Sequence, residues 1–185
     1  MMEFIRTNIT LVITALTLLS HVVLILGGLV FVVEEKFRAL VYRFVNKYIL
    51  LLLFGASLSA LIGSLAYSNI IGFPPCELCW IQRIFMYPQV LLSGVALWRK
   101  DKNIVTYLLS LSVLGGIVAL YHSLTHLGIG DGVVGCTSAL GDCGKLYVHE
   151  YGYITIPLMS FTVFTYLILL SIIYLKSERK INATE

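Results

Sequence analysis

The chain has 185 residues, of which 58% are hydrophobic and only 12% are charged, and its formal net charge is +3. Roughly a quarter of the residues in a soluble domain are charged, so this composition excludes an ordinary soluble protein. The small net charge gives no reason to expect nucleic-acid binding. The length fits one domain, and we expect an all-α integral membrane protein whose main solvent is the lipid bilayer.

Five segments are apolar and long enough to cross a hydrocarbon core, which takes about 20 helical residues. In chain order they are residues 9–33, 48–71, 80–98, 104–127 and 154–175. The first is longer than the apolar part of a signal peptide, about 7–15 residues, and no small-residue cleavage site follows it, so we expect a retained helix. The expected parts are an N-terminal helix with a basic linker (1–46), a four-helix domain (47–176) and a tail (177–185).

Basic residues indicate the orientation of these helices. Ten of the thirteen lysines and arginines follow the first, third or fifth predicted helix. They are Lys36, Arg38, Arg43, Lys47, Arg99, Lys100, Lys102, Lys176, Arg179 and Lys180. Five spans place these three segments on one side, and the positive-inside rule makes that side cytoplasmic. We therefore expect a multi-pass protein of the cell membrane with an outer N-terminus and a cytoplasmic C-terminus.

All four cysteines fall on the predicted outer side, where disulfides persist. Cys76 and Cys79 form a Cys-x-x-Cys at the start of the third helix, directly after two prolines that cannot continue the second helix. The partial positive charge of a helix N-terminus lowers the pKa of a thiol there and favours the reactive thiolate. This spacing and position predict a redox pair.

Cys136 and Cys143 lie in the second outer loop between glycines, separated by six residues. A disulfide that closes so short a loop contributes only about 2–3 kcal/mol, and exposed disulfides of this kind tend to be labile. We expect a second redox pair that meets an external partner. A structural disulfide and a zinc site of four cysteines are the alternatives, although this spacing suits zinc poorly.

Three further side chains are candidates for the site. Arg83 follows Cys79 by one helical turn, and an ionisable residue inside a span usually has a function; the alternative is that it only snorkels to the headgroups. His122 and His126 stand one turn apart near the outer end of the fourth helix. Either could serve an organic electron acceptor or merely contact backbone and water. His21 is expected to be a packed polar residue.

Small residues recur along two of the helices. They are Gly55, Ser59 and Gly63 on the second helix, and Gly115, Gly116 and Ala119 on the fourth. Small side chains on one face allow helices to approach closely in a membrane. We expect packing without a further function at both places.

The run Pro75-Cys-Glu-Leu-Cys-Trp-Ile-Gln-Arg83, followed by Met86-Tyr-Pro88, resembles the DsbB family of disulfide-bond formation proteins, and its BdbC branch in particular. The later Cys136…Cys143-Gly and Gly152-Tyr-Ile-Thr-Ile-Pro157 are similar to the same branch. The resemblance covers residues 48–175. Vitamin K epoxide reductases, a related family, carry their loop cysteines before the Cys-x-x-Cys, which is the reverse of the order here. The family has four spans, so the first predicted helix is an addition.

The resemblance implies a DsbB-like four-helix bundle that binds a quinone, either menaquinone or ubiquinone, and oxidises a DsbA/BdbD-like thioredoxin-fold partner. It implies that the partner attacks Cys136 and that Cys143 then passes reducing equivalents to Cys76. It places Cys79, Arg83 and His122 near the quinone, with no metal. The alternatives are a protein with structural or metal-binding cysteines and a reductase that runs from quinol to disulfide.

Overall fold

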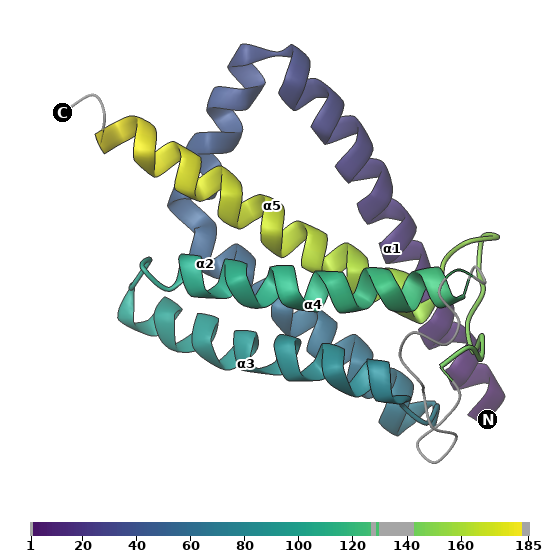
Figure 1. The fold of residues 1–185 in the computed structure, drawn as a ribbon. Coiled ribbons are helices and arrows are strands. Elements are labelled where there is room, and N and C mark those ends of the chain that lie inside the picture. The colour runs from purple at the N-terminus through teal and green to yellow at the C-terminus, as the bar shows by residue number, and fades with distance from the viewer. Residues whose placement is uncertain (1, 127–128, 130–142, 183–185) are drawn as a thin grey trace.

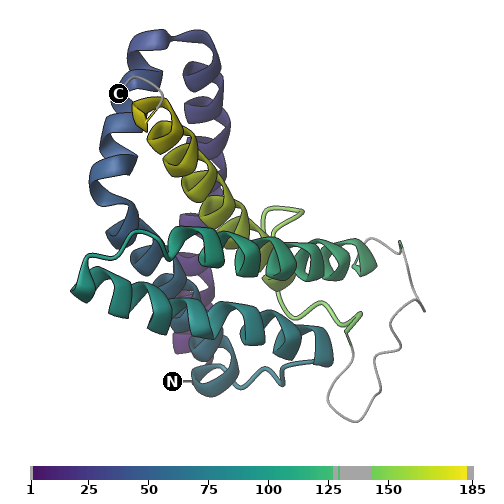
Figure 2. The same cartoon turned by 60° about the vertical axis from the view of Figure 1, so that its left-hand side comes forward.

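The computed structural model describes residues 2–126, 129 and 143–182, and these are mostly helical. The elements are α1 (Met2–Val33), α2 (Glu35–Leu65), the short π-helix η1 (Ala66–Ile70), α3 (Glu77–Arg99), α4 (Val105–Thr125) and α5 (Ile156–Asn182). Helices α2 to α5 pack each against the next, and α5 closes the group against α2 (Figures 1 and 2). The additional helix α1 contacts α2 and α5 from outside this group. The all-α prediction is confirmed.

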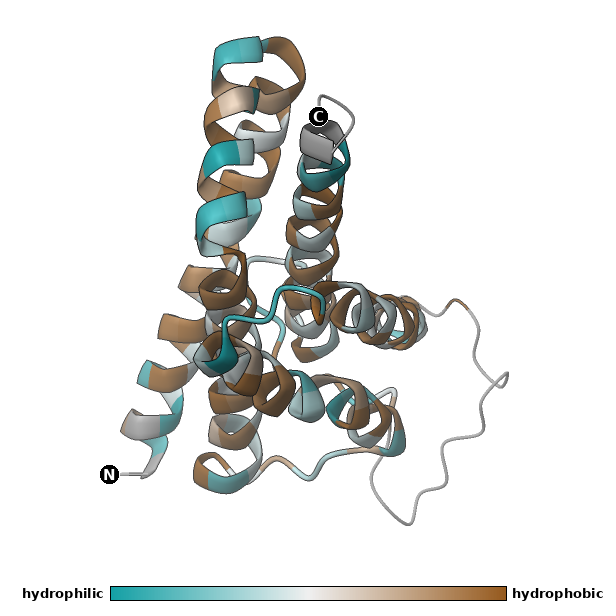
Figure 3. Cartoon of the chain, turned by 90° about the vertical axis from the view of Figure 1, so that its left-hand side faces the viewer, coloured by the Kyte–Doolittle hydropathy of each residue, from teal (hydrophilic) through white to brown (hydrophobic). Residues whose placement is uncertain are grey.

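Among the described residues, four helical segments are long and apolar enough to cross a membrane. They are Arg6–Val33, Glu35–Ile70, Val105–Thr125 and Ile156–Arg179, and hydrophobic residues colour most of their length in Figure 3. Helix α3 is not among them, although its 23 residues would span about 35 Å. It carries Gln82, Arg83 and Gln89, which lower its hydropathy. Of the five expected spans, the third, residues 80–98, is therefore the one that the hydropathy of the helix alone does not support.

The basic segment expected to link the first two helices is itself helical. Helix α2 begins at Glu35, so the basic residues that follow form its first turns, and only the extended Glu34 separates α1 from α2. No glycine or proline occurs between residues 34 and 47 to interrupt the helix. A Glu35–Arg38 ion pair of 3.0 Å adds local support. The helix therefore starts 13 residues earlier than position 48, where we expected it.

The three basic segments meet at one end of the molecule. Lys102 donates from Nζ to the carbonyl oxygen of Asn46 at 2.7 Å, and the Asn46 amide donates to the Ser177 hydroxyl at 3.3 Å. These bonds join α2, the α3–α4 turn and the end of α5. Figure 1 shows the α1–α2 connection and the C-terminus toward this end, and the N-terminus and the start of α3 at the other.

The two small-residue stripes have different surroundings. A Cβ at Gly115 would overlap Cζ of Phe164, so α4 approaches α5 as closely as glycine allows. The packing prediction is confirmed there. A Cβ at Gly55 or Gly63 meets nothing within 4 Å, and the packing prediction is wrong for these two positions of α2.

His21 connects α1 to the rest of the chain through hydrogen bonds. Its Nε2 lies 2.8 Å from the Thr162 hydroxyl of α5, and its Nδ1 lies 3.0 Å from the Tyr153 hydroxyl. Polar bonds between helices replace the water that a bilayer lacks. The prediction of a packed polar residue is confirmed.

Candidate functional site

Cys76 stands where an extended segment turns into α3. Gly72 has φ of +82°, which glycine adopts without steric cost, and Pro74 and Pro75 then prevent the helix from continuing. Cys76 caps α3, and its Sγ accepts a hydrogen bond from the backbone N–H of Cys79 at 3.4 Å. The prediction that the Cys-x-x-Cys opens the third helix is confirmed.

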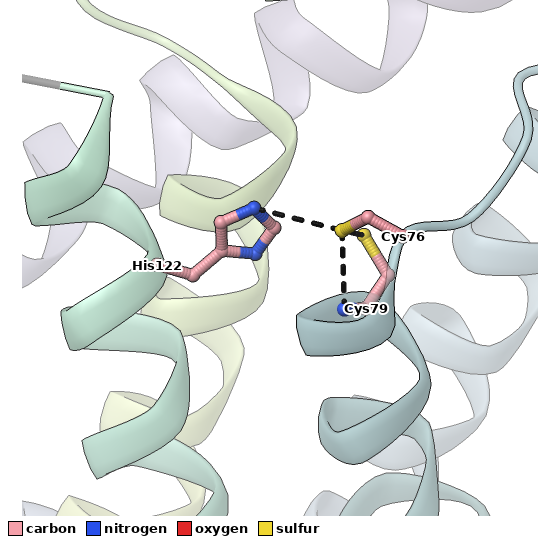
Figure 4. Close-up of side chains that lie close together, drawn as sticks. All are labelled: Cys76, Cys79 and His122. Atoms are coloured by element: carbon pink, nitrogen blue, oxygen red, sulfur yellow. Dashed lines mark hydrogen bonds between the residues drawn. The ribbon is translucent and has the colours of Figure 1, made fainter. Parts of the chain in front are cut away.

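The two sulfurs of this pair lie 2.8 Å apart, and both cysteines are free (Figure 4). The hydrogen bond from the Cys79 thiol, together with His122, lowers the pKa of Cys76 to about 4. The proton that the pair retains therefore rests on Cys79. The contacts of the Cys76 sulfur with the Cys79 thiol, the Cys79 backbone N–H and His122 favour the thiolate at this position. This lowered pKa favours the thiolate form of Cys76, the form that reacts in disulfide exchange.

His122 connects this pair to its surroundings. The side chain is only 2% exposed, and the Gln82 amide donates to its Nδ1 at 2.9 Å. With Nδ1 accepting, the proton of the neutral ring sits on Nε2. Nε2 lies 3.8 Å from the sulfur of Cys76 and 3.3 Å from the carbonyl oxygen of Cys143. His122 is thus placed to donate to the thiolate. Figure 4 shows its ring extending from α4 toward the sulfur of Cys76.

Cys143 lies beside the Cys-x-x-Cys. It is buried in one cluster with Cys76 and Leu78. Its carbonyl oxygen accepts from His126 at 2.9 Å as well as from His122. The predicted partner of Cys143, Cys136, lies outside the described residues, so their pairing stays a prediction.

Arg83 is bonded to α2. Its Nε donates to the Ser64 hydroxyl at 3.0 Å and its Nη2 to the Ser64 carbonyl oxygen at 3.3 Å. The guanidinium also lies 5.0 Å from the centre of the Trp80 ring, a cation–π distance. These contacts hold the charge between α2 and α3, which is not the arrangement of a side chain that only snorkels.

One cavity of about 850 Å³ connects these residues. Cys76, Cys79, Arg83, His122 and Cys143 all line it, with apolar side chains of α1, α2 and α5 forming much of the remainder. Its volume is in the range of pockets that hold small ligands. An apolar space with a guanidinium and an imidazole N–H suits a hydrophobic molecule that carries oxygen acceptors.

A metal ion is the other ligand to consider. The ligand atoms of Cys76, Cys79 and His122 lie within 4.8 Å of one another, close enough for a shared ion. Two thiolates on a tetrahedral zinc, each at about 2.3 Å, would lie about 3.8 Å apart, farther than the 2.8 Å between these sulfurs. The geometry favours a thiol–thiolate pair over a zinc centre.

Sequence reasoning gave no role to two residues of this site. Gln82 orients His122, and Ser64 holds Arg83. Gln82 could have been found, because it is an amide inside an apolar span and the expected cost of burying it unpaired is high. Ser64 carries no comparable signal, because serine is common in membrane helices.

Comparison with known proteins agrees with the resemblance noted in the sequence. The family model for "Disulfide bond formation protein DsbB" matches residues 46–174. A probable disulfide formation protein C from Bacillus cereus is 37% identical over 133 residues, covering 72% of this chain and 96% of its own. Disulfide bond formation protein C of Bacillus subtilis is 38% identical over 124 residues, covering 66% of this chain and 88% of its own.

A third relative, the SPbeta prophage-derived disulfide bond formation protein B of Bacillus subtilis, is 42% identical over 122 residues, covering 66% of this chain and 81% of its own. No solved structure matches the chain. The family model covers more than half of the chain, and relatives named disulfide formation protein C match it over most of their length. This helical membrane protein therefore belongs to the DsbB family of disulfide bond formation proteins.

Proposed function

We propose that this protein oxidises the thiols of an extracytoplasmic, DsbA/BdbD-like thioredoxin-fold protein and passes the electrons to a membrane quinone. The observation that carries the proposal is the shared cavity. The Cys76–Cys79 pair, Arg83 and His122 line the same apolar space as Cys143. A redox pair in such a space can reach a lipid-soluble acceptor, while Cys143 connects it to the outer loop. Membership of the DsbB family supports the thiol chemistry.

The first half of the reaction is thiol–disulfide exchange. A thiolate of the partner attacks Cys136 of a Cys136–Cys143 disulfide, and Cys143 leaves as a thiolate. The second thiol of the partner closes the partner's disulfide and releases Cys136. Cys143 then attacks Cys76 of an oxidised Cys76–Cys79 pair, Cys79 leaves, and Cys136 restores the loop disulfide. Two electrons and two protons have moved from the partner to Cys76 and Cys79. The burial of Cys143 against Cys76 supports the middle step.

The second half returns the Cys76–Cys79 pair to its disulfide. A bound quinone would supply an acceptor of two electrons and two protons. With a quinone bound, the Cys76 thiolate would attack the sulfur of Cys79, and the electron pair and the Cys79 proton would pass to that acceptor. The second proton is the one that Cys76 has already lost, and it would be taken up from solvent, while the Nε2–H of His122 supports the Cys76 thiolate. Arg83 and His122 are the cationic and N–H donors that line the cavity for the oxygen atoms of the acceptor.

We infer that α3 also crosses the membrane despite its low hydropathy, which brings the number of spans to five. Its polar side chains Gln82 and Gln89 are 6% and 1% exposed, whereas Ile84, Leu91 and Trp98 are 64%, 73% and 86% exposed. A helix with polar residues inside and apolar residues outside suits a lipid environment. Five spans and the positive-inside rule then put the basic end in the cytoplasm and the cysteines outside the cell membrane.

The test is turnover by the purified protein. A reduced thioredoxin-fold protein is mixed with the enzyme and a quinone, and quinol is followed by absorbance. We expect one quinol for each partner disulfide formed, and no turnover in Cys79→Ser. A reduced partner that lacks its second thiol should remain bound to the unmodified protein as a mixed disulfide at Cys136, with Cys143 released as the leaving thiolate. If Cys136→Ala oxidised the partner at the unmodified rate, the order of the relay would be wrong.

Two controls separate the alternatives left open by the sequence. The same assay started from quinol and oxidised partner gives the direction of electron flow, and faster reduction than oxidation would make the protein a reductase. Metal analysis of the purified protein addresses the cysteine–histidine cluster. One zinc per chain, with no titratable disulfide, would contradict the redox proposal.

A further inference from the structure

Helix α1 lies beside the cavity but outside the part of the chain that matches the family. The family model begins at residue 46, whereas α1 ends at Val33. Asn8, Val12, Leu16 and Ser20 of α1 nevertheless line the cavity. Residues four apart share one face of a helix, so a continuous stripe of α1 faces the space that also contains Cys79 and Arg83.

The opposite wall is made of small residues of α2. Ala56, Ser59, Ala60 and Gly63 line the cavity, and a Cβ at Gly63 would meet nothing within 4 Å. Side chains this small leave the space between the two helices unfilled. Met159, Val163 and Tyr166 of α5 also line the cavity. The part of the cavity between α1, α2 and α5 is therefore apolar and open.

Polar contacts fix α1 relative to the redox pair. Near its start, Arg6 donates from Nη2 to the carbonyl oxygen of Ile71 at 3.0 Å and lies 5.2 Å from the ring centre of Phe73. This is the segment that leads into Cys76. Farther along, the Tyr166 hydroxyl of α5 donates to the Ser20 carbonyl oxygen at 2.6 Å, next to the bonds of His21. The stripe of α1 is thus held at a defined place on the cavity.

We propose that α1 is an additional wall of the quinone site and that it holds the isoprenoid tail of the quinone against the small-residue face of α2. The occupant follows from continuity, because Val12 and Leu16 line the same cavity as Cys79 and Arg83. An acceptor whose ring lies near Cys79 must place its apolar tail along an apolar wall. The inference rests on the proposed function, since it assumes that the acceptor is a quinone.

The test compares two positions on α1 with quinones that differ only in the tail. Leu16 lines the cavity, whereas Leu19 is not part of the lining; their side chains are equally exposed, at 59% and 58%. The variants are Leu16→Trp and Leu19→Trp. The probes are a menaquinone with a tail of several isoprene units and menadione, which has the same ring without it. Equilibrium binding to the purified protein, with bound quinone extracted and quantified, gives a Kd that does not depend on turnover.

We expect Leu16→Trp to raise the Kd of the tailed quinone about tenfold, the effect of about 1.4 kcal/mol, and to leave that of menadione unchanged. Leu19→Trp should change neither. Unchanged menadione binding shows that the variant is folded. Gly63→Leu fills the cavity from the side of α2, so it should also raise the Kd of the tailed quinone and leave the Kd of menadione unchanged.

Three results would overturn the inference or its basis. If Leu16→Trp and Leu19→Trp raised the Kd of the tailed quinone equally, or if neither raised it, α1 would not be a wall of the site. If Leu16→Trp weakened both quinones to the same degree while Gly63→Leu weakened neither, the tail would lie elsewhere. If the unmodified protein bound neither quinone, the proposed function itself would fail.

Discussion

Glycines occur both at the seam between α4 and α5 and on the face of α2 toward α1. At the seam they allow close packing, whereas on α2 they leave space. At the seam, the ring of Phe164 occupies the place that a side chain at Gly115 would take, and Phe164 itself is fully buried. On α2, the space beside Gly63 is part of the cavity. The same small-residue pattern thus accompanies tight packing between α4 and α5 and a cavity between α1 and α2.

This difference shows what the bundle contributes to the site. The tight seam orients α4, and with it His122, toward the start of α3. The open face gives an apolar molecule access to Cys79 and Arg83. A membrane redox site needs both a rigid arrangement of its thiols and room for a hydrophobic acceptor, and the two faces supply one each.

The largest effect expected on this comparison is loss of stability at the seam. In Gly115→Ala the added Cβ would overlap two atoms of the Phe164 ring, so backbone or ring must move. Overpacking of this kind typically costs about 1–3 kcal/mol, and we expect the upper part of this range. Thermal unfolding in detergent should show a lower Tm. A Tm equal to that of the unmodified protein would mean that the helices are not in close contact here.

His122→Ala should raise the pKa of Cys76, because the ring supports its thiolate. A hydrogen bond to a charged group contributes about 1.5–3 kcal/mol, which corresponds to about one to two pKa units. The thiolate is present above the pKa and lost below it. The unmodified protein should therefore remain reactive toward iodoacetamide down to about pH 4, and the variant should lose reactivity at a higher pH.

Alkylation of reduced protein followed by peptide mapping measures this midpoint at Cys76. His126→Ala is the matched control, because this histidine follows one turn after His122, at the C-cap of α4, and bonds the Cys143 carbonyl oxygen. Its midpoint should stay at the unmodified value. Equal shifts in the two variants would show that the effect is not specific to the contact between His122 and the sulfur.

Arg83→Ala should weaken the binding of the quinone without destabilising the packing of α4 against α5. We expect the apparent KM for quinone to rise about tenfold, equivalent to about 1.4 kcal/mol, because a charged donor is lost from the cavity. Steady-state turnover at varied quinone gives the value. Arg99→Ala removes the same charge from the exposed far end of α3 and should leave KM unchanged; a rise in both variants would indicate a general effect of charge.

The smallest expected effect is that of Gly63→Ala on stability. Nothing lies within 4 Å of the added Cβ, and alanine favours a helix over glycine by about 1 kcal/mol or less. The Tm should rise slightly or stay the same, opposite in sign to Gly115→Ala. Gly55→Ala is the control, since it is equally free but does not line the cavity. A large fall in Tm for Gly63→Ala would remove the contrast between the two faces.

The sequence was informative about elements and about local chemistry. Hydropathy predicted the order of the five helices, and two prolines followed by Cys-x-x-Cys predicted the start of α3 at Glu77. These features depend on residues near one another in the chain. The start of α2 was misplaced, because the basic residues were interpreted as a loop although nothing in them interrupts a helix.

The contacts between helices were much harder to predict. The pattern of Gly55, Ser59 and Gly63 is the same whether a helix or a cavity faces it, because the relative rotation of two helices is not encoded in the spacing of either one. The bonds of Arg83 to Ser64 and of Arg6 to Ile71 join positions far apart in the chain. Without the packed helices, neither the cavity nor the part of α1 in it could be inferred.

A single turnover shows whether Cys76 and Cys79 pass two electrons to a quinone in the cavity. The double variant Cys136→Ser/Cys143→Ser keeps only this pair. After reduction and removal of the reductant, the protein is mixed with one equivalent of quinone, and quinol and free thiols are both counted. We expect one quinol to form and two thiols to be lost per chain. Two thiols remaining with no quinol formed would contradict this expectation.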